Sequence, residues 1–278
     1  MNTYQVIDSG NFQKLEQVGP YKLVRPAPGA VWSPQQSQSL WKEIDAKFER
    51  FSDGNGKWQV FNKSMPTEWN ITYGGSELHI QRTSFGHLGL FPEQAQNWQI
   101  IRELSTSDRE FKVLNLFAYT GGSSLAAAQA GALVTHLDAS KPSVDWAKNN
   151  ARLNHLDDKI RWIVDDAQKF IERESRRDNK YDAVILDPPS FGRGSKNQVW
   201  KIEEHLIPFL RNIKKILTPN FKYILLSSHS QGYTPFALNN ILRDIFGAKY
   251  EFRESEMTVV DENEFPIPSG ACSFLIHH

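Results

Sequence analysis

From about Trp98 onward, short apolar runs alternate with segments whose apolar residues recur at helical spacing. The apolar runs lie at 113–117, 133–137, 161–164, 183–186 and 223–226. Within them apolar residues follow one another without alternation, which is typical of strands buried on both faces. Repeated strand and helix units of this kind predict a parallel sheet covered by helices. Ligands of such sheets bind outside the carboxyl ends of the strands, where the strand order reverses.

The end of the chain breaks this alternation. Two further apolar runs, 256–260 and 272–276, are separated by a proline-containing loop, which predicts a hairpin. One strand of that hairpin must run against the others. The predicted fold class is therefore α/β, with a Rossmann-like, seven-stranded, mostly parallel sheet that contains one antiparallel strand.

The first part of the chain has a different pattern. Strand-like runs are short and are interrupted by Gly, Pro and Asn. Trp41, Ile44 and Phe48 recur at helical spacing, which predicts one helix within 41–51. We expect a small β-rich N-terminal module over 1–85, which helps to present substrate, and a second domain over 86–278.

Charge and cysteine content exclude several classes of protein. The 32 Lys and Arg residues equal the 32 Asp and Glu residues, which argues against a surface that is wholly a nucleic-acid or membrane footprint. The single cysteine, Cys272, allows neither an intramolecular disulfide nor a cysteine-ligated zinc site. The first residues lack a signal-peptide profile, and no apolar run approaches the roughly 18 residues that span a bilayer. We expect a cytoplasmic protein without membrane contact.

The first buried run leads into the loop N-L-F-A-Y-T-G-G at 115–122. Gly121 and Gly122 let the backbone approach a ligand closely, and the helix that follows begins with unpaired N–H groups. The loop is neither a dinucleotide-binding G-x-G-x-x-G nor a phosphate-binding P-loop, which removes the main support for hydride transfer and kinase chemistry. A tight strand-to-helix turn without a ligand is the alternative.

Acidic residues follow the next two buried runs. Asp138 lies about 20 residues beyond the glycine loop, where a carboxylate can accept hydrogen bonds from ribose hydroxyls. Asp165, Asp166 and Ala167 follow the third run, where a carboxylate can hold an adenine amino group. Helix capping is the alternative for both positions.

The fourth run ends in D-P-P-S-F at 187–191, which is the most specific motif in the chain. Two prolines stiffen the turn and remove two N–H donors, so Asp187 and the Pro188 carbonyl can both accept from one exocyclic amine. Phe191 can stack on a nucleobase. A merely rigid loop is the alternative, but it does not explain an acid at the tip of a buried strand.

The motifs at 115–122 and 187–191 resemble those of class I S-adenosylmethionine-dependent methyltransferases. More narrowly, the chain is similar to the bacterial group related to the large-subunit ribosomal RNA cytosine-5 methyltransferases. The resemblance covers about 84–278 and includes the stretch 85–94. It implies S-adenosylmethionine as cofactor and a base of RNA, in particular ribosomal RNA, as substrate. Methyl transfer of this kind works by orientation and electrostatics, so no metal is expected.

The resemblance also implies a role for each residue of these motifs. The residues that line the methionine part of the cofactor would be Phe117, Ala118, Tyr119, Thr120 and Gly121. Asp138 would hold the ribose, and Asp166 with Ala167 would hold the adenine. Gln94 is a further candidate for a cofactor contact. Asp187 and Pro188 would border the methyl group and the incoming nucleophile, with Phe191 beside them.

One position departs from the family pattern. Cytosine-5 transfer needs a thiolate, and the related enzymes place that cysteine after the fifth strand, where this chain has Ser227-Ser228-His229-Ser230. Cys272 is predicted at the start of the last strand, where a buried core cysteine competes with a catalytic one. We therefore predict an exocyclic or ring nitrogen as the methyl acceptor.

Three questions stay open at this level. His229 can act as a general base or as a locally hydrogen-bonded loop residue. The acceptor can instead be a small molecule or a protein side chain. The chain can also be a cofactor-binding module that docks on RNA or a partner without catalysis.

Overall fold

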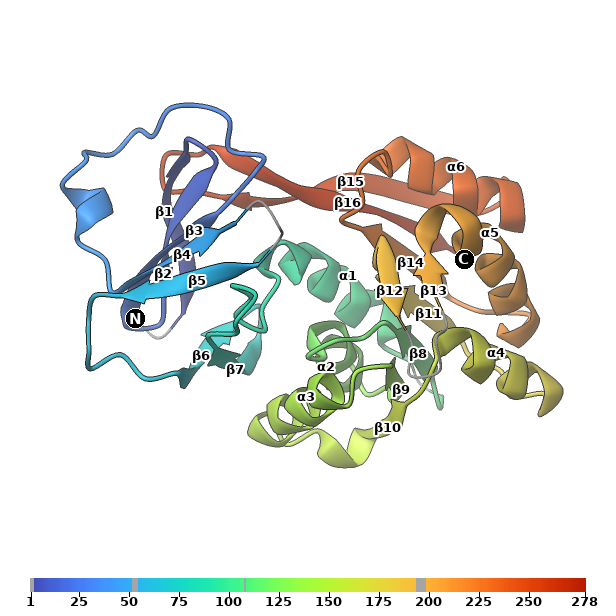
Figure 1. Cartoon of the computed structure of the whole chain (residues 1–278). Coiled ribbons are helices and arrows are strands. Elements are labelled where there is room, and N and C mark those ends of the chain that lie inside the picture. Colours follow the sequence, from blue (N-terminus) through green and yellow to red (C-terminus); the bar gives the residue numbers. More distant parts are fainter. Residues whose placement is uncertain (1–2, 52–54, 108, 194–198) are drawn as a thin grey trace. The chain divides into compact units, whose positions relative to one another are not determined.

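The computed structural model describes residues 3–51, 55–107, 109–193 and 199–278 (Figure 1). The chain forms two compact units. The first unit contains Met1–Ala95 and Thr258–Ser269, and the second contains Gln96–Met257 and Gly270–His278. The end of the chain therefore contributes to both units. The division of roles at residue 85 stays a prediction.

The first unit is β-rich, as predicted. Its five-stranded sheet has the order β1-β2-β3-β4-β5, in which only the β3–β4 pair is parallel. A separate antiparallel pair consists of β6 and β7. The bounds are β1 Tyr4–Gly10, β2 Gln13–Val18, β3 Tyr21–Pro26, η1 Leu40–Lys42, β4 Ala46–Arg50, β5 Gly56–Val60, β6 Glu68–Tyr73, β7 Ser76–Gln81 and η2 Pro92–Gln94.

The helix predicted within 41–51 is wrong. Within this range only Trp41 and Lys42, the last two residues of η1, are helical, and the strand β4 follows. In β4 the buried Ala46 and Phe48 alternate with the more exposed Lys47 and Glu49. Pairing with β5 sets this period of two, because Phe48 lies opposite Trp58 across the sheet. Helical spacing and strand alternation overlap in so short a stretch.

The second unit contains the predicted seven-stranded sheet, with the order β10-β9-β8-β11-β14-β16-β15. Its first five strands are parallel, and β16 runs antiparallel to β14, with Cys272 opposite Ser227. This confirms the α/β, Rossmann-like fold class. The bounds are β8 Lys112–Leu116, β9 Leu133–Asp138, β10 Ile160–Val164, β11 Ala183–Leu186, β14 Tyr223–Ser228, β15 Glu251–Val260 and β16 Pro266–Ile276.

Helices cover both faces of this sheet, with α1 to α3 on one face and α4 to α6 on the other (Figure 1). Alternate strand residues such as Leu114, Leu116 and Leu186 join the apolar cluster under α4, α5 and α6. The bounds are α1 Ala95–Ser105, α2 Gly122–Gln129, α3 Lys141–Leu153, η3 Asp157–Lys159, α4 Ala167–Arg176, α5 Ile202–Ile213, η4 Lys214–Ile216 and α6 Pro235–Phe246.

Across the described ranges, no helix has both the length and the apolar character needed to cross a membrane.

Candidate active site at the carboxyl ends of the strands

The candidate site lies where the strand order of the second unit reverses. The chain builds outward from β8 through β9 to β10, and then returns to β11 on the other side of β8. A cavity of about 600 Å³ is lined by residues at the carboxyl ends of these four strands. They include Phe117 after β8, Asp138 at the end of β9, Asp165 after β10 and Asp187 after β11. This is the position expected for a ligand of an open parallel sheet.

The lining of this cavity is acidic. Among the described residues of the lining, five carry a carboxyl group and one, Lys169, carries an ammonium group; the acids are Asp138, Asp165, Asp166, Glu172 and Asp187. Asp165 forms an ion pair with Arg173, which offsets part of this charge. The remaining carboxylates favour a ligand that bears positive charge.

Asp138 connects two of the loops that shape the cavity. Its Oδ2 accepts from the backbone N–H of Tyr119 at 2.9 Å, and its Oδ1 accepts from the N–H of Ser140 at 2.8 Å. Burial raises the pKa of Asp138, while these two hydrogen bonds lower it, and the effect of burial is larger. The helix-cap role considered for this region belongs to Ser140, whose Oγ accepts from the N–H of Ser143 at the start of α3.

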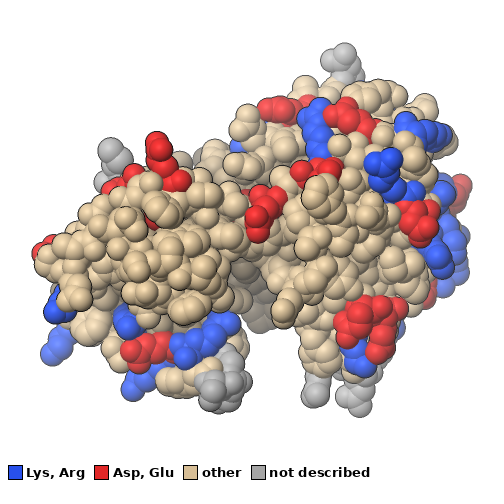
Figure 2. All heavy atoms as spheres, turned by 90° about the horizontal axis from the view of Figure 1, so that it is seen from above, with Lys and Arg blue, Asp and Glu red and all other residues tan. Residues whose placement is uncertain are grey.

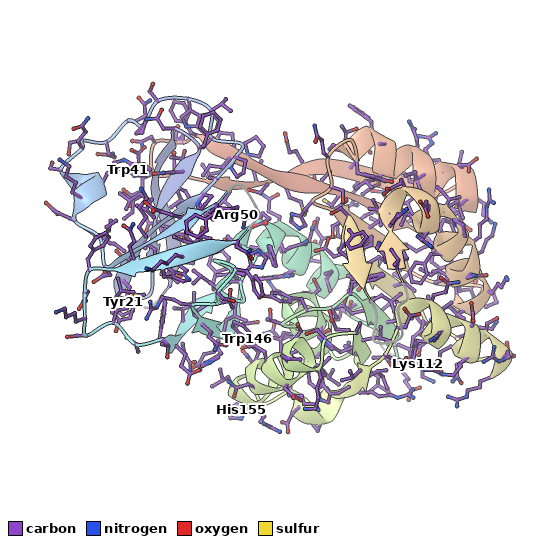
Figure 3. All side chains as sticks on the ribbon, in the orientation of Figure 1. Tyr21, Trp41, Arg50, Lys112, Trp146 and His155 are labelled. Atoms are coloured by element: carbon purple, nitrogen blue, oxygen red, sulfur yellow. The ribbon has the colours of Figure 1, made fainter. Side chains whose placement is uncertain are left out.

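The loop after β8 has a strained backbone. Phe117 has φ 56° and Tyr119 has φ 49°, a left-handed conformation that non-glycine residues rarely adopt. The side-chain amide of Asn150 holds the loop by donating to the Thr120 carbonyl at 2.9 Å. Trp146 of α3, labelled in Figure 3, lies with its ring 6.4 Å from that of Tyr119. Strain of this kind persists only where the surroundings impose it, and it is typical of functional sites.

The two glycines of this loop serve different purposes. Gly121 has φ 90°, a left-handed backbone conformation that glycine adopts without steric cost. Gly122 has ordinary backbone geometry, but a Cβ there would lie 2.4 Å from Cζ2 of Trp98. The absence of a side chain at Gly122 is therefore required by packing against α1.

A series of buried hydrogen bonds lies next to the same loop. The amide of Asn115 donates to Oγ of Ser124 at 2.9 Å, and Ser124 Oγ lies 3.0 Å from Nδ1 of His136. Since Ser124 accepts from Asn115, its own proton is available to His136, whose Nδ1 then acts as an acceptor. Burial lowers the pKa of His136 to about 3, so the ring is neutral at ordinary pH.

The D-P-P-S-F loop is held by contacts that its sequence does not reveal. The indole Nε1 of Trp200 donates to the Pro189 carbonyl at 2.7 Å. Trp200 belongs to the hairpin of β12 (Phe191–Arg193) and β13 (Val199–Lys201), and its ring packs 5.1 Å from that of Phe117. The ring of His205 also stacks on that of Trp200, with their centroids 5.7 Å apart. Trp200 and His205 both line the cavity, and sequence reasoning missed them.

Asp187 has a histidine beside it. His229 follows β14, and its Nε2 lies 3.5 Å from Oδ2 of Asp187. Both side chains are half-buried. A Cβ at Gly270 of β16 would lie 3.0 Å from Nδ1 of His229, so the glycine makes room for the imidazole. The fold thus brings a carboxylate and an imidazole together from two different strand ends.

Cys272 lies inside the sheet. It is 1% exposed, and its Sγ lies 3.3 Å from Oδ1 of Asn97 and 3.2 Å from Oγ of Ser255. Burial raises the pKa of the Cys272 thiol, and the charge of Asp187 acts in the same direction. A nucleophilic cysteine needs the opposite, a lowered pKa and access to substrate.

The structure brings some of the predicted site residues together and leaves others apart. Around one cavity lie Phe117, Asp138, Asp166, Ala167 and Asp187. In the described part of the chain, Ala118, Tyr119, Thr120 and Gly121 form the adjoining loop and are not part of that lining. Pro188 is buried beside Asp187, and Phe191 is 52% exposed on β12. Gln94 is buried in η2 of the first unit, so its cofactor contact stays a prediction.

Asp166 has two structural roles. Its Oδ1 accepts from the N–H of Lys169, which makes it the N-cap of α4, and the residue also lines the cavity. The capping alternative considered from the sequence is therefore correct, and it does not conflict with a ligand contact by the same side chain.

Comparison with known proteins identifies the family. A family model described as S-adenosylmethionine-dependent methyltransferase matches residues 30–244. A solved structure of the SAM-dependent methyltransferase from Agrobacterium tumefaciens is 38% identical, with a TM-score of 0.92 over 99% of this chain and 91% of that chain. The chain belongs to the S-adenosylmethionine-dependent methyltransferases. This confirms the resemblance noted in the sequence. The protein is a methyltransferase, and its cofactor is S-adenosylmethionine.

Two relatives named Ribosomal RNA large subunit methyltransferase K/L match part of the chain. The protein from Pseudoalteromonas atlantica is 35% identical over 147 residues, which is 52% of this chain and 20% of that protein. The protein from Alteromonas mediterranea is 29% identical over 194 residues, which is 69% of this chain and 27% of that protein. The chain thus spans about a quarter of the length of these relatives or less.

The residues around the cavity fit the cofactor of the family. S-adenosylmethionine carries a sulfonium and an ammonium group, which the acidic lining complements. Asp138 offers a partly buried carboxylate for hydroxyl donors, and the rings of Phe117 and Trp200 offer apolar walls. When bound, the cofactor supplies an electrophilic methyl group.

Proposed function

We propose that the chain transfers a methyl group to a nitrogen atom of a base in RNA, with ribosomal RNA as the favoured substrate. The names of the relatives from Pseudoalteromonas and Alteromonas support the choice of RNA. Ribosomal RNA also places the reaction in the cytoplasm. The exposed Phe191, four residues after Asp187, offers a ring on which a base that has left its helix can stack.

The burial and the raised pKa of Cys272 are the observations that favour a nitrogen acceptor. Carbon-5 of a pyrimidine becomes nucleophilic only after a thiolate adds to the ring. Cys272 is the only cysteine in the sequence, and it is buried with a raised pKa. A base nitrogen needs no such activation because it has its own lone pair.

The residues around Asp187 have complementary roles in this proposal. The carboxylate of Asp187 and the carbonyl of Pro188 accept hydrogen bonds from the N–H groups of the acceptor, which orients its lone pair. His229 takes up the proton that the nitrogen loses when the N–C bond forms. Asp187 stabilises the resulting imidazolium across the 3.5 Å that separates their side chains.

The cofactor roles in this proposal are those that the family resemblance implies. Asp138 accepts from the ribose hydroxyls, and Asp166 with Ala167 borders the adenine. The loop from Phe117 to Gly121 borders the methionine part, and its strained backbone is the feature that supports this assignment.

Transfer of a labelled methyl group tests the proposal. The purified chain is incubated with labelled S-adenosylmethionine and, in separate reactions, undermodified ribosomal RNA, transfer RNA and a protein extract. Label in ribosomal RNA, with a methylated nitrogen found by nucleoside analysis, is the expected result. Label in protein alone, or on a pyrimidine carbon, would show that the acceptor is wrongly assigned.

A matched pair of variants links the activity to this site. Asp187→Asn should lower kcat by about 100-fold or more, because the acceptor is no longer oriented and the imidazolium no longer stabilised. Asp244→Asn, on the exposed face of α6, should keep wild-type kcat. Both should bind S-adenosylhomocysteine and unfold cooperatively. Wild-type turnover in Asp187→Asn would disprove its catalytic role.

A further inference from the structure

We propose that the first unit contains a binding site for an unpaired nucleobase of single-stranded RNA. The site is a cavity of about 370 Å³ beside the turn between β1 and β2. Its residues belong to the first unit, and none of them lines the cofactor cavity. The choice of RNA as ligand rests on the proposed function.

The chemistry of the lining is that of base recognition. The side chains that matter are Asn11, Gln13, Gln36, Gln38, Trp41 and Lys42. Each amide offers a donor and an acceptor on one planar group, which can match the hydrogen-bonding edge of a base. The indole ring offers a stacking surface, and one cation suits the adjoining phosphate. A carboxylate would repel that phosphate, and the lining that the structure describes contains none.

The amides are available to a ligand. Among the described residues, the side chains of Asn11, Gln13 and Gln38 form no hydrogen bond within the chain. Gln36 donates through Nε2 to Asn263 at 3.1 Å, a bond that orients its amide. An amide oriented in this way is a specific hydrogen-bonding partner, because its donor and acceptor ends are distinguished.

The cavity is held open by a buried carboxylate. Asp8 is fully buried and accepts from the backbone N–H groups of Gln35 and Gln36, from Nε1 of Trp41 at 2.7 Å and from Nδ2 of Asn263 at 3.1 Å. These bonds organise the connection between β3 and β4, in which η1 is the single regular element described. Long connections of this kind in a compact unit are usually functional.

The indole of Trp41 is fixed on one side. Trp41, labelled in Figure 3, packs against the apolar cluster of Ile7, Leu15 and Val24 while its Nε1 is bound to Asp8. A ring held in this way does not collapse into the cavity that it lines. Preorganised groups bind more tightly because little ordering is needed on association.

The adjoining turn presents an exposed aromatic residue. Asn11 has φ 50° and Phe12 has φ 62°. Their backbone N–H groups donate to the carbonyls of Trp32 at 2.7 Å and Ala30 at 2.8 Å, which imposes the conformation. Phe12 is 59% exposed and lies in the chain between two residues of the lining. Positive φ at both central residues is what a two-residue hairpin turn between paired strands favours. The turn places the exposed Phe12 directly between Asn11 and Gln13 of the lining, where its ring is available for stacking.

The surface charge agrees with a neutral ligand group. Figure 2 shows a broad area without Lys, Arg, Asp or Glu across the visible face of the first unit, with charged side chains gathered at its margins. A site for a phosphate would gather cations at its centre. The described lining of the cavity has Lys42 as its single cation, so it suits a base with one adjoining phosphate better than a bare phosphate group.

Binding of short labelled oligo-U, oligo-C and oligo-A to the full-length protein tests the site, with anisotropy as the readout. Phe12→Ala should weaken binding about tenfold, the loss expected for one stacked base. Gln38→Ala should weaken binding of one oligonucleotide more than that of the others. The control variants are Phe61→Ala, which removes an equally exposed ring of the same unit, and Gln81→Ala on β7, and both should bind as the wild type does.

Three results would overturn the inference: no oligonucleotide binding by the wild-type protein, equal affinity in Phe12→Ala, or equal losses in the control variants. Methyl transfer, measured in parallel, separates this inference from the proposed function. If RNA is methylated but the cavity variants bind as the wild type does, the nucleobase site is wrong and the function stands. If oligonucleotides bind at the cavity but label enters only protein, the function is wrong and the site stands.

Discussion

The indole of Trp200 donates a 2.7 Å hydrogen bond to the carbonyl of Pro189, the second proline of the loop after β11. Two consecutive prolines leave that loop without two N–H donors, so it is held through its acceptors. The same indole packs against Phe117, which follows β8. Trp200 therefore links the two loops that flank the point where the strand order reverses.

Trp200→Phe should lower the kcat/KM of methyl transfer about fivefold, the effect of one lost hydrogen bond of about 1 kcal/mol. The phenyl ring keeps the packing against Phe117, so the free energy of unfolding should change little. Trp58→Phe is the matched control, since it removes an indole bond of 2.8 Å to the Thr83 carbonyl in the first unit. An equal loss of kcat/KM in both variants would contradict the role given to Trp200.

Gly122→Ala should lower the free energy of unfolding by about 1–3 kcal/mol, as overpacking does. The added Cβ would lie 2.4 Å from the ring of Trp98, and neither group can move without disturbing α1 or α2. Gly131→Asn is the control, because nothing lies within 4 Å of a Cβ there and asparagine tolerates its φ of 93°. Denaturant unfolding measures both variants. A stable Gly122→Ala protein would show that Trp98 does not require the glycine.

Binding of S-adenosylhomocysteine should weaken on acidification. The affinity should begin to fall at a higher pH than it would if Asp138 had the pKa of an ordinary aspartate. Burial raises the pKa of Asp138, so the free protein takes up a proton there above the usual value of about 3.9. Hydroxyl donors bind the ionised form, so binding requires that this proton be released and affinity falls as pH falls. Calorimetric titration from pH 7 toward about pH 4 measures the dependence.

Asp138→Asn provides the control for this pH dependence. The amide accepts less strongly, so affinity should be lower at neutral pH, but it does not titrate. Its affinity should therefore change less over the same range. An unchanged slope would mean that another carboxyl group of the cavity governs the effect.

Cys272→Ser should keep the wild-type rate of methyl transfer. The thiol is buried and its pKa is raised, so it is protonated at neutral pH. The folded wild-type protein should also resist alkylation by iodoacetamide, and unfolding should expose the thiol to the reagent. Loss of activity in Cys272→Ser, together with rapid alkylation of the folded protein, would favour a covalent mechanism on carbon.

The pattern of apolar runs is enough to predict the layered sheet and the chain positions of the acids at its edge. Strands buried on both faces need continuous apolar runs, so β8, β9, β11 and β14 were visible without tertiary information. Asp187 stood out because a carboxylate at the end of such a run needs a partner. Asp138 stood out because it lies about 20 residues beyond the glycine loop. The motifs around Phe117 and Asp187 also indicated the family that the comparisons confirm.

Other features of the protein depend on contacts between residues that are distant in the chain. Phe48 is in a strand because β5 pairs with it, although its spacing from Trp41 and Ile44 also suits a helix. Gly122 is required by Trp98, and the Pro189 carbonyl is held by Trp200. The pKa of Cys272 is raised mainly by burial, which depends on segments distant in the chain. Local pattern predicts which residues are buried, but only packing determines which groups meet and what their contact does to geometry and charge.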